Sequence, residues 1–573
     1  MLRAAASSFA RPCRRSLVPP RTADGFFFDA AIMPTADPIS ALVIDRSPDM
    51  RGNLRAMLGQ CGIEDVQPAA SAAAAIRKLE ERAYDLILCE YALGEGQDGQ
   101  HLLEDLRTHH IIPLSTVFIM VTGESSYERV VSTVELAPND YLLKPFTADL
   151  LYQRLARALE KRDAFLPAYG LIEIGNLQEA AEQCRLGEEK APQYAIDFLR
   201  LRAELQVALG QSDQAQETYR RVLEKKAVPW AKLGLARTLF MQKRYREAED
   251  DLQKLIKEHR QYLDAYDWLA RTREATGRLK EAQQALQEAV SVSPHTLRRL
   301  KKLGDIALDT GDMAVAERVL SEVVRKGKYS DFRDPEHHVK LVKVLVAKGD
   351  REQAEKTIRD LDRSMQGLPQ TQACSALSSA MLLVQAGDKA KALEALNRAL
   401  EASRSNAALS NDLKIELVRT CLDNEQQEAA AEVICDVMRN TSDDRALEKA
   451  KGVLEQAGLK SMADELALKT RQDVVDLVST GARHAESGNY EGAVDFMLQA
   501  VRKMPGNTQV GLNAALALLK LIEHRGWQEQ FAAQARDLID RARSSDPANP
   551  RIGALSTYFQ NMLSKYGIQP ARS

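Results

Sequence analysis

Two small residues recur at a fixed spacing through most of this 573-residue chain. A glycine is followed five positions later by an alanine, in copies that begin at Gly175, Gly210, Gly277, Gly311, Gly349, Gly387 and Gly488, with degenerate copies at Lys243 and Asn424. From Gly277 to Gly311 the distance is 34 residues, and from Gly311 to Gly349 it is 38. Such a period predicts helical units that bury their apolar faces only by stacking on their neighbours.

The copy between Asp264 and Pro294 shows the unit most clearly. Gly277 ends a first helix, Ala282 and Ala289 let a second helix approach it closely, and Pro294 stops that second helix. This copy resembles a tetratricopeptide repeat. The resemblance implies an all-α superhelix with a concave groove lined by the first helices, an architecture that binds proteins or peptides.

The repeats differ in quality along the chain. We assign tetratricopeptide repeats to residues 165–360 and further, more irregular repeats to residues 361–565. Val474–Pro505 is a second well-formed copy, whereas residues 440–475 match poorly. We expect irregular helices there and a break in the superhelix.

Basic residues fall at the groove-facing positions of the first repeats. They are Arg200, Arg237, Arg271, Arg298 and Lys301. A basic stripe suggests a peptide groove for an acidic ligand segment. Asp264, Asp267 and Asp305 interleave with these cations, so the alternative is an ordinary solvated helix face.

Residues 39–162 follow a different pattern, in which apolar strand-like runs alternate with helical ones. The runs are Ala41–Ile44, Asp85–Cys89, Thr116–Val121 and Tyr141–Leu143, and the helical segments include Arg51–Cys61, Ser71–Arg82 and Asp149–Glu160. This alternation predicts a parallel sheet covered by helices on both faces. Binding sites in such sheets form at the carboxyl ends of the strands.

Those strand ends carry polar residues in a fixed order. They are Asp45 and Arg46, then Glu90, Asp98-Gly99, Thr122-Gly123 and Lys144-Pro145, with Tyr141 just before the last pair. The set resembles the phosphorylation site of CheY-like receiver domains. The resemblance implies a flavodoxin-like fold with a five-stranded parallel sheet and makes Tyr141 the switch aromatic. Glu90 stands where that family has its phosphorylated aspartate, and Arg46 replaces a second acid.

These two replacements change the chemistry of the site. Phosphoryl transfer to a receiver uses Mg²⁺, which requires oxygen ligands. Arg46 places a cation where a metal-ligating carboxylate is expected, so it would repel Mg²⁺ and could pair with Glu90 or Asp45. We therefore expect no catalytic residue, no metal site and no cofactor, we doubt that Mg²⁺ binds, and we expect no phosphorylation of the usual kind.

Three interpretations of Glu90 remain open. In the first, its carboxylate partly imitates an acyl phosphate, which carries about −1.5 to −2 charge, and holds Thr122 and Tyr141 inward. In the second, Glu90, Lys144 and Arg46 form an ion cluster that only stabilises the fold. The third is phosphorylation of Glu90 itself or of Cys89.

The beginning of the chain differs from the rest. Arg3, Arg11, Arg14, Arg15 and Arg21 precede the first acid, Asp24. This is the composition of an organellar transit peptide, and the alternative is that Met33 is the true start. In either case we expect residues 1–38 to be disordered.

Composition excludes several classes of function. The formal net charge of −3 argues against a nucleic-acid partner, and no apolar run is long enough for membrane insertion. The scattered cysteines indicate a reducing compartment and a cytoplasmic location. His109-His110 and His337-His338 are expected at the surface, and no catalytic motif was found.

The whole chain resembles bacterial response regulators in which a receiver domain precedes tetratricopeptide repeats. We expect a non-catalytic phosphorelay regulator, not an enzyme, that acts by protein–protein interaction. Its partners would be a histidine kinase, another response regulator or a protein bound by the repeats, and a homodimer is a further expectation. The alternative is a constitutive assembly scaffold whose receiver-like head is only structural.

Overall fold

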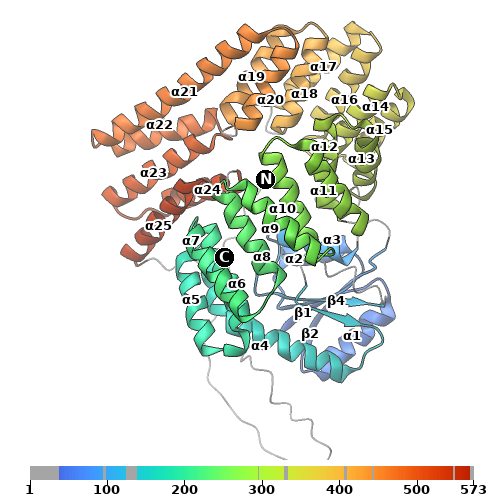
Figure 1. The fold of residues 1–573 in the computed structure, drawn as a ribbon, viewed down its shortest axis with the longest axis vertical. Coiled ribbons are helices and arrows are strands. Elements are labelled where there is room, and N and C mark those ends of the chain that lie inside the picture. The colour runs from blue at the N-terminus through green and yellow to red at the C-terminus, as the bar shows by residue number, and fades with distance from the viewer. Residues whose placement is uncertain are drawn as a thin grey trace, which may run out of the picture.

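A computed structural model gives the fold, which combines one sheet with a long array of helices (Figure 1). The structure describes residues 38–94, 98–123, 138–173, 175–294, 296–327, 333–404, 409–441, 444–545 and 549–567. The extension expected over residues 1–38, with its alternative start at Met33, lies outside the described residues except for Pro38.

The sheet has five parallel strands, as expected, and their order is β2-β1-β3-β4-β5. The strands are β1 (Ser40–Ile44), β2 (Asp65–Ala69), β3 (Leu86–Glu90), β4 (Val117–Thr122) and β5 (Asp140–Leu143), and the helices α1 (Pro48–Gln60), α2 (Ala72–Glu81) and α3 (Gly99–Thr108) lie between them. One buried cluster joins the sheet to α1 and to the helix α4 (Ala148–Glu173), and a second joins it to α2 and α3. Both faces of the sheet are therefore covered.

Strand β2 was not located from the sequence. Its five residues include Pro68, which has no N–H to donate, and only Val66 and Ala69 are buried. Proline is tolerated in an edge strand, and β2 lies at the edge beside β1. The strand was not predicted because it has few apolar residues and contains a proline.

Helix α4 (Ala148–Glu173) is more than twice as long as the expected segment Asp149–Glu160. Its first half buries Leu151, Leu155 and Leu159 against the sheet. Its second half packs on the repeats, where Phe165 stacks on Phe198 with ring centres 3.9 Å apart. One continuous helix thus belongs to both parts of the molecule, across the interval between the expected domains.

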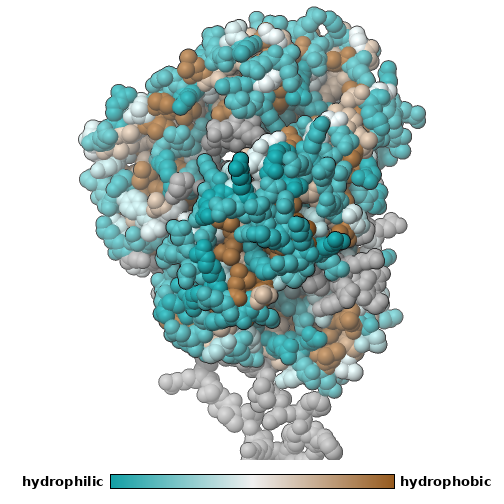
Figure 2. All heavy atoms as spheres, in the orientation of Figure 1, coloured by the Kyte–Doolittle hydropathy of each residue, from teal (hydrophilic) through white to brown (hydrophobic). Residues whose placement is uncertain are grey.

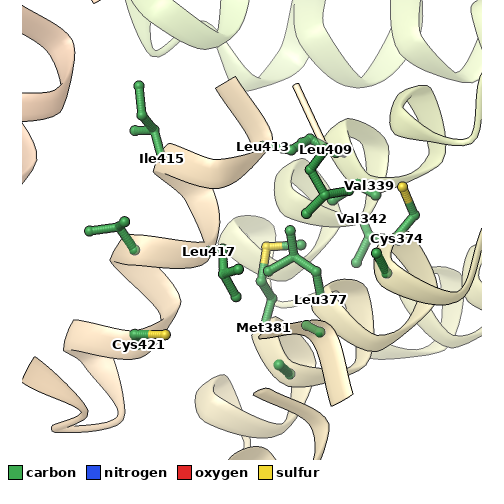
Figure 3. Packing of buried hydrophobic residues seen from close by; sticks show 14 of the residues in the cluster. Val339, Val342, Cys374, Leu377, Met381, Leu409, Leu413, Ile415, Leu417 and Cys421 are labelled. Carbon is green, nitrogen blue, oxygen red and sulfur yellow. The ribbon is translucent and has the colours of Figure 1, made fainter. Parts of the chain in front are cut away.

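The remaining elements form the helical array. They are α5 (Leu177–Lys190), α6 (Ala195–Ala208), α7 (Ser212–Lys225), α8 (Pro229–Met241), α9 (Tyr245–Glu258), α10 (Leu263–Ala275), α11 (Leu279–Val292), α12 (Leu297–Thr310), α13 (Met313–Gly327), α14 (Glu336–Lys348), α15 (Arg351–Ser364), α16 (Thr371–Gln385), α17 (Lys389–Arg404), α18 (Asn411–Asp423), α19 (Gln427–Asn440), α20 (Asp444–Gln456), α21 (Lys460–Glu486), α22 (Tyr490–Lys503), α23 (Thr508–Arg525), α24 (Glu529–Ser545) and α25 (Pro550–Lys565), with a short 3₁₀ turn at Pro192–Tyr194. Figure 3 shows how successive units share a core: Leu377 and Met381 of α16 point toward Leu417 of α18.

The glycine–alanine spacing marks turns between paired helices. Gly277, for example, has φ +77° at the end of α10, and Ala282 is fully buried on α11. In the degenerate copy assigned to Asn424 the left-handed residue is Glu425 (φ +61°), and Ala430 is the buried alanine. The assignment to Asn424 was therefore wrong by one residue. Asparagine sometimes takes the place of glycine at such turns, but here the next residue, Glu425, adopts the left-handed conformation.

The segment expected to be irregular contains a turn of the same kind. Gly458 has φ +78°, and Ala463, five residues later, is fully buried. Helix α21 then continues for 27 residues with no turn between units. One buried cluster of the array ends at Ala463 and another begins at Ala493, so the apolar core divides along α21.

The far end of the array returns to its beginning. In Figure 1 the red helix α25 lies near the teal helices of the first repeats, and its Gly553 approaches the carbonyl oxygen of Leu209 at the end of α6. Gln560 Nε2 of α25 donates a hydrogen bond of 2.8 Å to the carbonyl oxygen of Gly175, just after α4. The array therefore closes on itself.

Candidate functional site

The ends of strands β1, β3 and β5 bring two carboxylates and one ammonium group together. Lys144 Nζ lies 3.2 Å from Asp45 Oδ2 and pairs with Glu90 Oε2. The Asp45 side chain is 5% exposed and that of Glu90 12%. The sequence placed these three residues at one edge of the sheet, and the structure brings them into contact.

Backbone groups hold the two carboxylates in place. Asp45 Oδ1 accepts a hydrogen bond of 2.8 Å from the N–H of Ser47, at the start of α1. Glu90 Oε1 accepts one of 3.2 Å from the N–H of Ala92, so this side chain turns back onto its own loop. Each carboxylate thus uses one oxygen for Lys144 and the other for the backbone.

The charge of Lys144 is set by this arrangement. Burial alone would lower the pKa of the ammonium group, but the hydrogen bonds and negative charges of Glu90 and Asp45 outweigh burial and raise it. The lysine is therefore a stable cation between two acids, and it offsets part of their negative charge.

Arg46 lies outside this cluster. Its side chain is exposed, and its guanidinium group lies beside Gly94, 3.0 Å from where a Cβ of that glycine would be. Among the residues that the structure describes, Arg46 pairs with neither Glu90 nor Asp45. The expected cluster of Glu90, Lys144 and Arg46 is therefore wrong in one member: Asp45 takes the place of Arg46, because the arginine turns outward at the start of the loop.

Thr122 and Tyr141 lie close to the cluster in the fold. Thr122 ends β4, is buried, and its carbonyl oxygen accepts a hydrogen bond of 2.8 Å from the N–H of Lys144. Tyr141 is half-buried and packs against the apolar cluster beneath α2 and α3. Lys144 is followed by a cis peptide bond to Pro145.

Gly99 and Cys89 explain the tight packing behind Glu90. A Cβ on Gly99 would lie 2.6 Å from the carbonyl oxygen of Glu90, so only glycine fits at the start of α3. Cys89 is fully buried, and burial raises the pKa of its thiol well above the usual value. A protonated, enclosed thiol is a poor nucleophile, which disfavours phosphorylation of Cys89.

The basic stripe expected on the repeats is interleaved with tryptophans. The Arg200 guanidinium lies 5.5 Å from the ring centre of Trp230, and those of Arg237 and Arg271 lie 5.2 and 4.8 Å from that of Trp268. These contacts are cation–π interactions on α6, α8 and α10. That the arginines stack on aromatic rings was not predicted from the sequence.

The other two residues of the stripe face the sheet domain. Arg298 and Lys301 of α12 line a cavity of about 380 Å³ together with Glu104 and Asp105 of α3. The two acids of α3 were missed by the sequence analysis. The sequence does place them on the side of the helix away from the buried Leu102, Leu103 and Leu106. That pattern predicts a polar helix face, but it does not predict that the repeats lie against this face.

The histidine pair at α14 is not at the surface, contrary to expectation. His337 is 9% exposed and His338 is fully buried, and both line the same cavity. Burial, reinforced by the positive charge of Lys301, lowers the pKa of His337 to about 4. Charged residues next to the pair in the sequence suggested an exposed helix turn, whereas neighbouring elements of the fold enclose it.

No helix in the described part of the chain is both long enough and apolar enough to cross a membrane. No three His, Cys, Asp or Glu side chains there are arranged to hold a metal ion.

Both parts of the chain contain segments that are similar to known protein families. Residues 41–156 match the response regulator receiver domain family, and residues 200–262 and 239–303 match tetratricopeptide repeat families. Chemotaxis protein CheY-3 of Vibrio cholerae is 26% identical over 120 residues, which are 21% of this chain and 91% of that protein. Transcriptional regulatory protein ZraR of Escherichia coli O157:H7 is 33% identical over 144 residues, 25% of this chain and 32% of that protein. The NtrX receiver domain from Brucella abortus is 30% identical, covering 21% of this chain and 98% of that one with a TM-score of 0.20.

Proposed function

Because the chain is a receiver domain followed by tetratricopeptide repeats, we propose that it is a non-catalytic regulator whose receiver is held in one state without phosphorylation. Its partners are a histidine kinase, another response regulator or a protein bound by the repeats. The observation that carries this proposal is the position of Lys144 between Asp45 and Glu90.

The donor set at the strand ends fits Mg²⁺ poorly. The carboxylates of Asp45 and Glu90 already share one ammonium group, and Arg46 stands where a further acid would be needed. A magnesium ion would have to displace Lys144 and tolerate a nearby guanidinium. We therefore derive no phosphoryl-transfer step at this site.

A small-molecule phosphodonor tests the proposal directly. The full chain is incubated with acetyl phosphate and Mg²⁺, and intact mass is measured. We expect no added phosphoryl group on the wild type. The matched control is Glu90→Asp with Arg46→Asp, which restores both acids of the receiver pattern and should take up phosphate. Phosphorylation of the wild type at Glu90, or saturable millimolar Mg²⁺ binding followed by intrinsic fluorescence, would overturn the proposal.

Helix α4 favours a second candidate function. Because this helix is shared by the head and the repeats, the head could serve only as a folded cap on an assembly scaffold. Glu90→Gln separates the two functions, since it removes the charge of Glu90 and leaves its shape. A regulator should retain a different amount of a signalling partner when the full-length variant and wild type are compared by affinity capture. Identical capture would indicate a scaffold.

A further inference from the structure

Two polar helix faces meet where the receiver lies on the repeats. His101, Glu104, Asp105 and Thr108 of α3 all line the cavity. Their spacing of three and four residues places them on one face of the helix. Arg298, Lys301, Lys302 and Asp305 of α12 line the opposite side with the same spacing. The polar face of α3 therefore lies across the cavity from the polar face of α12, which is one of the first helices that line the groove of the repeats.

Acids of α3 lie across the cavity from cations of α12, of which Arg298 also pairs with Asp267 and Lys302 with Glu274 inside the array. The carboxylate of Glu104 lies within electrostatic range of Arg298 and Arg299, and that of Asp105 acts on Lys301. Lys301 makes no ion pair within 4.0 Å among the described residues, and Asp334 and Asp105 are the acids that act on it most strongly. Burial lowers the pKa of Lys301, and Asp105 is the acid of the receiver that offsets part of this effect.

This contact has the properties of a reversible one. Charged residues of α3 and α12 line it and leave a cavity of about 380 Å³ between them, whereas permanent interfaces are closely packed. Helix α4 tethers the two sides, so the contact forms at a high effective concentration and needs little intrinsic affinity. Pro167, exposed within α4, removes one backbone hydrogen bond and marks a place where the helix can bend.

We propose that the surface of α12 and α14 is a recognition site for an acidic helix, that α3 of the receiver occupies it in this structure, and that a partner protein binds by presenting an acidic helix that displaces α3. This inference rests on the proposed protein-binding function and names the chemistry of the partner. It does not depend on the state of Glu90, so the phosphodonor experiment and the one below can fail independently.

Charge reversal in the full chain tests the proposal. Asp105→Lys should release α3 and increase hydrogen–deuterium exchange in α12 and α14. A fluorescent, helix-stapled peptide with the sequence of residues 98–110 serves as the probe. It should bind Asp105→Lys about tenfold more tightly than wild type, because it no longer competes with the tethered helix. Lys301→Asp should also release α3 but should not bind the probe.

Two controls separate docking from misfolding. Asp105→Lys combined with Lys301→Asp restores opposite charges and should return exchange in α12 to the wild-type level. Glu81→Lys, an exposed reversal on α2, should leave exchange and probe binding unchanged. The proposal is overturned if Asp105→Lys leaves α12 as protected as in wild type. It is also overturned if α12 becomes exposed but the probe does not bind, because the contact would then be internal packing only.

Discussion

At the scale of single residues, Gly234 sets how closely two helices of the array approach. A Cβ on this residue would lie 2.3 Å from the ring of Tyr219, which is fully buried. The Tyr219 hydroxyl donates a hydrogen bond of 3.0 Å to Glu204, and Glu204 pairs with Arg237. A shift of the Tyr219 ring would therefore disturb Glu204 and, through it, Arg237, which stacks on Trp268.

We expect Gly234→Ala to lower the free energy of unfolding by about 1–3 kcal/mol, because the added methyl group overpacks this crossing. Urea denaturation followed by circular dichroism measures the change. Gly452→Ala in α20 is the matched control: nothing lies within 4 Å of its Cβ, so alanine should stabilise its helix by about 0.5–1 kcal/mol. Equal stability of Gly234→Ala and wild type would show that the crossing relaxes freely.

The residues at the strand ends were the most predictable part of the site. Asp45, Glu90 and Lys144 each follow an apolar strand, and parallel strands end at one edge, so their proximity follows from topology. Arg46 was not predictable, because an arginine side chain spans several ångströms and its direction depends on the adjoining loop. Glu104 and Asp105 were missed because long-range packing, and not local pattern, decides what covers a helix face.

At the scale of elements, α14 carries His337 into the contact between the array and α3. The groups whose charges act on this imidazole are Lys301 of α12, Asp334 just before α14 and Lys340 within it. Burial and Lys301 lower its pKa from 6.5 to about 4. The folded protein thus keeps His337 neutral where an unfolded chain would protonate it.

We expect the free energy of unfolding to fall as the pH is lowered from about 6.5 to 4, because the unfolded state alone takes up this proton. The loss attributable to His337 is at most about 3–4 kcal/mol. Unfolding is measured by urea titration at several pH values for wild type and His337→Gln, so that contributions from other groups cancel in the difference. Parallel pH profiles of the two proteins would contradict the assignment.

Element boundaries were predictable where local chemistry sets them and not where packing does. Gly277 and Gly488 adopt the left-handed conformation that ends a helix, so those turns were visible in the sequence. The extension of α4 beyond Glu160 was not visible in the sequence, and neither was the continuity of α21 over 27 residues. Both helices pass from one apolar cluster to the next, and no residue at the junction forces a turn.

At the scale of the whole molecule, closure of the array is the feature that the repeat pattern did not predict. A stack of similar units fixes the relation between neighbours, but small rotations accumulate over many units. Whether the two ends of the array meet depends on the accumulated rotation and on a few contacts between the first and last helices. Here α25 meets the carbonyl groups of Gly175 and Leu209, which lie at the carboxyl ends of α4 and α6.

Gly553 is the position at which this closure can be tested. A Cβ there would lie 2.7 Å from the carbonyl oxygen of Leu209, and the backbone of α6 cannot retreat as a side chain could. We expect Gly553→Leu to detach α25 from the first repeats and to increase the radius of gyration measured by small-angle X-ray scattering, while far-ultraviolet circular dichroism is unchanged. Gly511→Ala in α23, where nothing lies within 4 Å of the new Cβ, should scatter like wild type. Superimposable curves for Gly553→Leu and wild type would mean that the curvature of the stacked units alone holds the two ends together.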